Sequence, residues 1–102
     1  MEDDIIGLLE KLWAKIKDNM DSRELVRHLD NYKNNIDNIE ELEELNEGFN
    51  HMLNELFPLY LEDKMSFREL LLLIKPKVRD ALKYIFTKLL EESAQYNSPE
   101  IR

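Results

Sequence analysis

The stretch Met65-Ser66-Phe67-Arg68-Glu69-Leu70 is the clearest helix start in the chain. Ser66 has the position of an N-cap, because its hydroxyl can accept a hydrogen bond from the Glu69 amide. The Glu69 carboxylate can in turn accept a hydrogen bond from the Ser66 amide, which completes a capping box. We therefore predict that a helix begins at Phe67 and that the preceding residues 58–64 form a linker.

Three more helices are predicted before this linker, because apolar residues recur there at intervals of three and four. They are expected over three ranges, about 4–19, 21–34 and 39–57. The polar residues 34–38 favour a turn between the second and third helices, although one unbroken helix to Phe57 is the alternative. Pro58 is expected to end the third helix.

The last helix is expected to be interrupted and wide. From Leu70 to Ile74 the sequence is apolar on every side, which predicts burial all round. Pro76 lacks an amide hydrogen and its ring clashes with the carbonyl four residues earlier, so a kink or a split is expected there. The apolar stripe then continues with Val78, Leu82, Ile85 and Leu89. Because Phe86 and Leu90 add a second apolar row, this helix should be central or should contact a partner.

These elements predict an all-α fold. Four helices with short connections favour an antiparallel up-and-down four-helix bundle whose last helix is kinked or split near Pro76. The length of 102 residues is enough for one core. We expect a single domain over residues 1–92 and a tail over residues 93–102 that frays, since the tail has no apolar period.

Composition excludes several classes of protein. The net charge of −8 argues against nucleic acid as a whole-surface partner. The absence of cysteine removes disulfides and thiolate chemistry, as a reducing cytosol would allow. No apolar run approaches the roughly 18 residues of a membrane span, and the acidic start is unlike a signal peptide. We therefore expect a cytoplasmic protein.

Charge is distributed unevenly along the chain, with a net charge of −11 over residues 1–63 and of +3 over residues 64–102. One interpretation is that these blocks only tune solubility and helix dipoles. The other is that they form docking faces for an acidic partner or for anionic lipid headgroups. In the second interpretation the partner-binding residues are Lys77, Lys83, Tyr84, Phe86, Lys88 and Leu90.

Helical spacing determines where these residues should lie. Lys77, Tyr84 and Lys88 follow at intervals of seven and four, on the side away from the apolar stripe. Arg79 and Lys83 are expected on the other flank, next to the second apolar row. An alternative for the wide apolar face is that it forms a homodimer interface.

Candidate catalytic or metal-binding groups are sparse. Glu47, His51 and Glu55 share one helix face, but a complete site would need further ligands, so we predict a solvated face and no metal. Arg23 and His28 resemble the Arg-x4-His motif of a family of small helical ribonucleases. This pair opens the second helix instead of lying late in the bundle as in that family. We therefore predict no enzyme activity and no cofactor.

A longer match covers residues 49–69. The family pattern has a third helix reading apolar-Asn-x-apolar-apolar-Asn-x-Leu-aromatic, then a short linker, a Lys, an apolar residue and x-Phe-x-Glu. The matching residues here are Asn50, Asn54, Leu56, Phe57, Lys64, Met65, Phe67 and Glu69. In these positions the chain resembles the immunity proteins of class IIa (pediocin-like) bacteriocins from lactic acid bacteria and streptococci.

The resemblance implies a cytoplasmic four-helix bundle without catalytic activity. Such proteins protect the cell by acting on the bacteriocin-bound mannose phosphotransferase permease at the inner membrane face, and their C-terminal half carries much of the specificity. Carried onto this chain, that half contains the six partner-binding residues named above. The competing hypothesis is an acidic adaptor or inhibitor, whose third helix binds a basic protein partner through its glutamates from Glu40 to Glu55.

Overall fold

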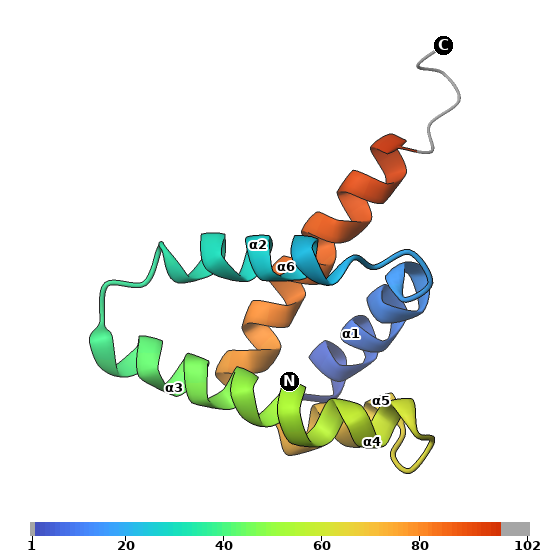
Figure 1. The fold of residues 1–102 in the computed structure, drawn as a ribbon, viewed down its shortest axis with the longest axis horizontal. Helices are drawn as coiled ribbons and strands as arrows, with labels where there is room; N and C mark the ends of the chain where they lie inside the picture. The colour runs from blue at the N-terminus through green and yellow to red at the C-terminus, as the bar shows by residue number, and fades with distance from the viewer. Residues whose placement is uncertain (1, 97–102) are drawn as a thin grey trace.

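The computed structural model describes residues 2–96, and every regular element in that range is helical (Figure 1). The all-α prediction is therefore confirmed for the described residues. In chain order the elements are α1 (Glu2–Ile16), α2 (Ser22–Lys33), α3 (Ile39–His51), the π-helical segment η1 (Met52–Leu56), α4 (Phe57–Leu61), α5 (Phe67–Leu73) and α6 (Pro76–Tyr96).

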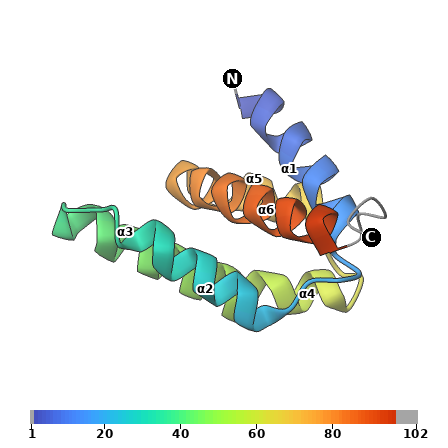
Figure 2. The ribbon, with the colours of Figure 1, turned by 90° about the horizontal axis from the view of Figure 1, so that it is seen from above.

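The long helix α6 lies in the centre of the fold. It packs against α1 on one side and against α2 and α3 on the other, as two perpendicular views show (Figures 1 and 2). The helices α2 and α3 run antiparallel in one layer and cross α6 instead of running alongside it (Figure 1). The up-and-down four-helix bundle is therefore not confirmed, and the described residues form more helical elements than four.

Side-chain caps begin three of the helices. Ser66 Oγ accepts from the Glu69 amide at 3.1 Å, and Glu69 Oε1 accepts from the Ser66 amide at 2.8 Å, so the predicted capping box is confirmed. Asp21 caps α2 by accepting from the Arg23 amide. Asn38 accepts from the first two amides that follow Ile39 and caps α3. The predicted turn between α2 and α3 is confirmed as well.

Pro58 does not end a helix, which corrects the sequence-based prediction. The elements α3, η1 and α4 follow one another without a break. In the π-helical segment the amide of Phe57 bonds to the carbonyl of Met52, five residues earlier. The wider turn ends just before Pro58, which then lies in the first turn of α4. A proline is tolerated there because an amide in that position has no partner within its own helix.

Just after α4 and its C-cap Glu62, Asp63 has a left-handed backbone with a φ of 63°. The Asp63 amide bonds to the carbonyl of Tyr60, and the Lys64 amide bonds to that of Leu59. These two bonds form a Schellman motif, with Asp63 in the position that glycine usually occupies. The motif turns the chain out of α4 and into the cap of α5.

Between α5 and α6 the chain is split ahead of Pro76. Ile74 is extended, with φ −91° and ψ 160°, so α5 stops before the proline and α6 begins with it. Arg79 of α6 is only 4% exposed and turns back over the break. Its Nη1 donates to the carbonyl of Leu71 at 2.8 Å and to that of Ile74 at 3.1 Å. The guanidinium thereby satisfies carbonyls that the end of α5 leaves without a helical partner.

The predicted burial of the whole 70–74 segment is wrong. Leu70, Leu71 and Ile74 are buried, whereas Leu72 and Leu73 are 53% and 58% exposed. The short helix α5 packs on α1 and α4. Its opposite face is therefore left at the surface.

Aromatic rings fill one end of the core. Trp13 stacks on Phe67 with ring centres 5.0 Å apart, and its ring also packs against Phe57, Tyr60 and Phe86. Its Nε1 donates to the Tyr60 hydroxyl at 2.8 Å. The cluster joins α1, α4, α5 and α6, because each of these helices contributes at least one ring.

The end of the chain differs from the prediction in one respect. The first part of the predicted tail, residues 93–96, continues α6, and the remaining residues, 97–102, lie outside the described residues. Within the described part of the chain, no helix has the length and apolar character that crossing a bilayer requires.

The helix α3 lies close to α6 at Gly48, where the nearest side chain is that of Val78. A methyl group added at Gly48 would collide with Cγ2 of Val78, whereas one added at Gly7 would have open space around it. We expect Gly48→Ala to lower the free energy of unfolding by about 1–3 kcal/mol through overpacking. Gly7→Ala, the matched control, should raise it by about 0.5–1 kcal/mol, because alanine favours the helix.

Urea denaturation followed by circular dichroism measures both changes. In the double variant Gly48→Ala/Val78→Ala, the new methyl fills space that the valine vacates, so its loss should be smaller than the sum of the two single losses. A Gly48→Ala protein as stable as the parent chain would contradict the close approach.

Candidate functional site

The residues predicted as a basic row on α6 are partly used within the fold. Lys77 Nζ lies 3.6 Å from Glu41 Oε1 and 3.5 Å from Glu44 Oε1, so it connects α6 to α3. The ring of Tyr84 packs against that of Tyr32 in α2, with centres 5.4 Å apart. These two side chains therefore lie along the seam between α6 and the α2–α3 layer.

The other predicted partner-binding residues differ in exposure. Lys83 is exposed, while Lys88 and Leu90 are half-buried. Lys88 Nζ lies 5.6 Å from the centre of the Tyr84 ring, a cation–π contact. Phe86 is 2% exposed and belongs to the aromatic core, which corrects its prediction as a binding residue.

The burial of α6 also bears on two related predictions. Arg79, expected on an exposed flank, instead lies inside the fold and caps α5. The wide apolar face proposed for a homodimer contains Val78, Leu82 and Ile85, each at most 1% exposed. That face is used in the core because α1, α2 and α3 all pack against α6.

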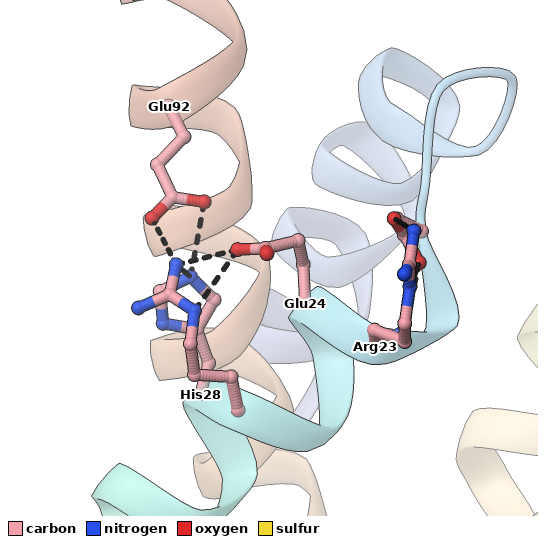
Figure 3. A network of polar contacts seen from close by, with 6 residues as sticks. Arg23, Glu24, His28 and Glu92 are labelled. Carbon is pink, nitrogen blue, oxygen red and sulfur yellow. Dashed lines mark hydrogen bonds and ion pairs between the residues drawn. The ribbon is translucent and has the colours of Figure 1, made fainter.

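In each of the two groupings considered for chemistry, one residue pairs with a nearby carboxylate. The head of Arg23 is exposed and pairs with Asp21, away from His28 (Figure 3). His51 pairs with Glu55 at 3.5 Å. With Glu47, it lines a pocket between the end of α3 and the break after α5. Because the Arg23 side chain pairs with Asp21 and points away from His28, Arg23 and His28 do not form a joint site.

A cluster of polar side chains instead joins α2 to α6. It consists of Glu24, Arg27 and His28 from α2 and Glu92 from α6 (Figure 3). Glu92 Oε1 lies 3.1 Å from His28 Nε2, and Glu92 Oε2 accepts from Arg27 Nη2 at 2.7 Å. Glu24 Oε1 accepts from both Nε and Nη2 of Arg27. We call these four residues the α2–α6 polar cluster.

The four side chains of the cluster differ in how far they are buried. The His28 side chain is 5% exposed, whereas the side chains of Glu24, Glu92 and Arg27 are each between 41% and 49% exposed. His28 Nδ1 is buried and has no hydrogen-bond partner among the described residues. The hydrogen bond with His28, aided by the Arg27 guanidinium, holds the pKa of the Glu92 carboxyl below its ordinary value.

One part of this cluster was visible in the sequence. Glu24 and His28 are four residues apart, so they share a face of any helix that contains them. Glu92 could not be assigned to them, because it lies in another helix and only the crossing of α2 over α6 brings it close.

No protein-family model matches the chain, and no curated protein or solved structure is similar to it. The function is therefore inferred from the residues of the chain itself.

The lowered pKa of Glu92 predicts a pH-dependent contribution to stability. Because its pKa is lower in the folded chain, the contribution is present above the ordinary value of 4.5 and is lost as the pH falls through the lowered value. At neutral pH, Glu92→Gln should therefore lower the free energy of unfolding by up to about 1 kcal/mol, the range of partly exposed ion pairs. Near pH 3 the difference from the parent chain should shrink.

Urea denaturation of both proteins across this pH range measures the difference. Glu91→Gln is the matched control, because Glu91 is exposed and lies 4.0 Å from Lys88 in a surface pair. The control should change stability little at any pH. A Glu92→Gln deficit that stays constant from neutral to acid pH would contradict the role assigned to this carboxylate.

Proposed function

We propose that this chain is a cytoplasmic immunity protein of the class IIa bacteriocin type. It protects the cell by binding the bacteriocin-bound mannose phosphotransferase permease at the inner membrane face. It forms and breaks no covalent bond, so binding by its C-terminal half accounts for its effect. The observation that carries this proposal is the resemblance of residues 49–69, which includes two spaced asparagines and a Lys-apolar-x-Phe-x-Glu segment.

The positions of the matching residues are compatible with a shared framework. Leu56 is buried, and Phe57 and Phe67 belong to the aromatic cluster around Trp13. Asn50 and Asn54 are exposed on the helix that ends beside this cluster. The match thus consists of core residues and a helix cap together with two surface amides. It supports a common architecture more directly than a common binding surface.

The helical elements can be grouped into four segments. Because α3, η1 and α4 are continuous, they can be counted as one segment, and α5 and α6 can be counted as one segment that is split at Pro76. With α1 and α2, this count agrees with the four-helix bundle that the resemblance implies. In this chain α2 and α3 cross the central helix.

The proposed contact surface lies on the C-terminal half. Lys83 is exposed, and Lys88 and Leu90 are half-buried at the edge of α6. The exposed Leu72 and Leu73 of α5 add apolar surface to the same half of the chain. Exposed leucines and lysines together suit a contact at a membrane face, where apolar groups meet the headgroup region and bases attract anionic lipids.

Expression of the chain in a strain sensitive to pediocin-like peptides tests this proposal. We expect the parent chain to raise the inhibitory concentration of at least one peptide in a panel. Lys83→Glu/Lys88→Glu should lose this protection, because it reverses the charge of the proposed surface. Lys11→Glu/Lys15→Glu is the control, since both residues are exposed bases on α1 and lie outside that surface.

Circular dichroism and protein levels in the cell establish whether each variant is folded and expressed. Equal protection by the charge-reversed and control variants would contradict the proposed surface. Absence of protection by the parent chain against the whole panel would contradict the immunity function itself.

A second candidate function rests on the outer face of α3. Glu40, Glu43 and Glu47 are exposed there at helical spacing. A row of carboxylates on one helix face can steer a basic protein partner to that face. This arrangement favours an acidic adaptor or inhibitor as the alternative function.

The alternative predicts salt-sensitive binding. Glu40→Gln/Glu43→Gln/Glu47→Gln should weaken capture of a basic partner from lysate, and raising the ionic strength should weaken capture by the parent chain. Lys83→Glu/Lys88→Glu should leave this capture intact. Capture that is independent of both salt and the glutamates would exclude an electrostatic mechanism.

A further inference from the structure

The α2–α6 polar cluster has the donor set of a metal site. Glu24 and His28 are one helical turn apart on α2, and Glu92 faces them from α6 (Figure 3). The potential ligand atoms of these three side chains all lie within 4.8 Å of one another. To bind all three at the distance of about 2.0–2.2 Å typical of such ligands, a metal ion would draw the ligand atoms closer together, which rotation of the partly exposed glutamate side chains allows.

The chain's own cation marks where such an ion would lie. Arg27 Nη2 is 2.7 Å from Glu92 Oε2 and 3.4 Å from His28 Nε2, and it also donates to Glu24 Oε1. One guanidinium nitrogen is therefore in contact with a ligand atom of each of the three side chains. This nitrogen has the place, relative to the three donors, that a bound cation would take.

Charge and burial favour exchange of this guanidinium for a divalent ion. The two carboxylates carry two negative charges, and Arg27 compensates only one of them. The Arg27 side chain is 49% exposed and can rotate into solvent, whereas the His28 side chain is 5% exposed and is held in place. The cluster thus combines a fixed imidazole, two movable carboxylates and a displaceable monovalent cation.

We propose that Glu24, His28 and Glu92 bind a divalent transition-metal ion, with Zn²⁺ as the best match, and that the ion displaces the Arg27 guanidinium. One imidazole and two carboxylates suit zinc, and three protein ligands leave a fourth position for water. The bound ion clamps α2 to the C-terminal part of α6. This site is independent of the proposed immunity function.

Zinc binding to the full chain, measured by competition with a chromophoric chelator, tests the proposal. We expect saturable binding of one Zn²⁺ per chain. Arg27→Gln should tighten binding by about 2- to 30-fold, because removing two partly exposed ion pairs releases both carboxylates. Glu92→Gln and Glu24→Gln should each weaken binding by at least about tenfold, since each removes a ligand charge.

Thermal unfolding provides a second readout. An ion that binds only the folded chain raises its Tm, by about 10 °C at a zinc concentration of about 100 times the Kd. His51→Ala is the matched control, because His51 and Glu55 form an exposed pair that could bind zinc on the surface. This variant should bind zinc and gain stability as the parent chain does.

Replacing the buried His28 could unfold the chain, so the test uses variants of the two carboxylates instead. Glu92→Gln and Glu24→Gln change partly exposed groups, and circular dichroism shows whether they remain helical. The proposal is overturned if neither the parent chain nor Arg27→Gln binds zinc. It is also overturned if Glu92→Gln binds as tightly as the parent chain, or if His51→Ala abolishes binding.

Discussion

The arrangement of the helices depends on the break between α5 and α6, and the guanidinium of Arg79 stabilises this break by hydrogen bonding to backbone carbonyls. The chain leaves α5 with an extended residue, Ile74, and begins α6 at Pro76, so the carbonyls at the end of α5 need donors from elsewhere. Arg79 supplies them from inside the fold, at 2.8 Å and 3.1 Å. Hydrogen bonds from a charged donor contribute about 1.5–3 kcal/mol each to stability. The break frees α5 to pack on α1 and α4 while α6 crosses the centre.

The central position of α6 decides which of its residues can contact another molecule. Its wide apolar face is covered by α1, α2 and α3, so Phe86 and the valine and leucine stripe form the core. Lys77 and Tyr84 are engaged along the seam with the neighbouring layer. What remains accessible is a narrower strip that includes Lys83, where Asp80 and Glu91 are exposed as well. A docking surface on this helix is therefore mixed in charge and limited in apolar area.

Two groups of acids in this chain have different surroundings. The glutamates on the outer face of α3 lie in solvent, where water screens them and each contributes little by itself. Glu92 lies against a buried histidine and an arginine, and this contact lowers its pKa. The exposed glutamates can steer charged partners at long range, whereas Glu92 acts through direct contacts with Arg27 and His28. The crossing of α2 over α6 creates this difference between otherwise similar residues.

The sequence by itself determined the features that depend on neighbours along the chain. The all-α class, the Ser66–Glu69 capping box, the turn before Ile39 and an interruption near Pro76 all follow from local hydrogen bonding and helical period. Only the tertiary structure decided which apolar faces were covered and that Glu92 contacts His28. It also showed that a π-helical segment precedes Pro58, so that the helix continues past this residue. These outcomes depend on how the helices cross. Helical period specifies the faces of each helix but not the angle or the partner with which each face packs.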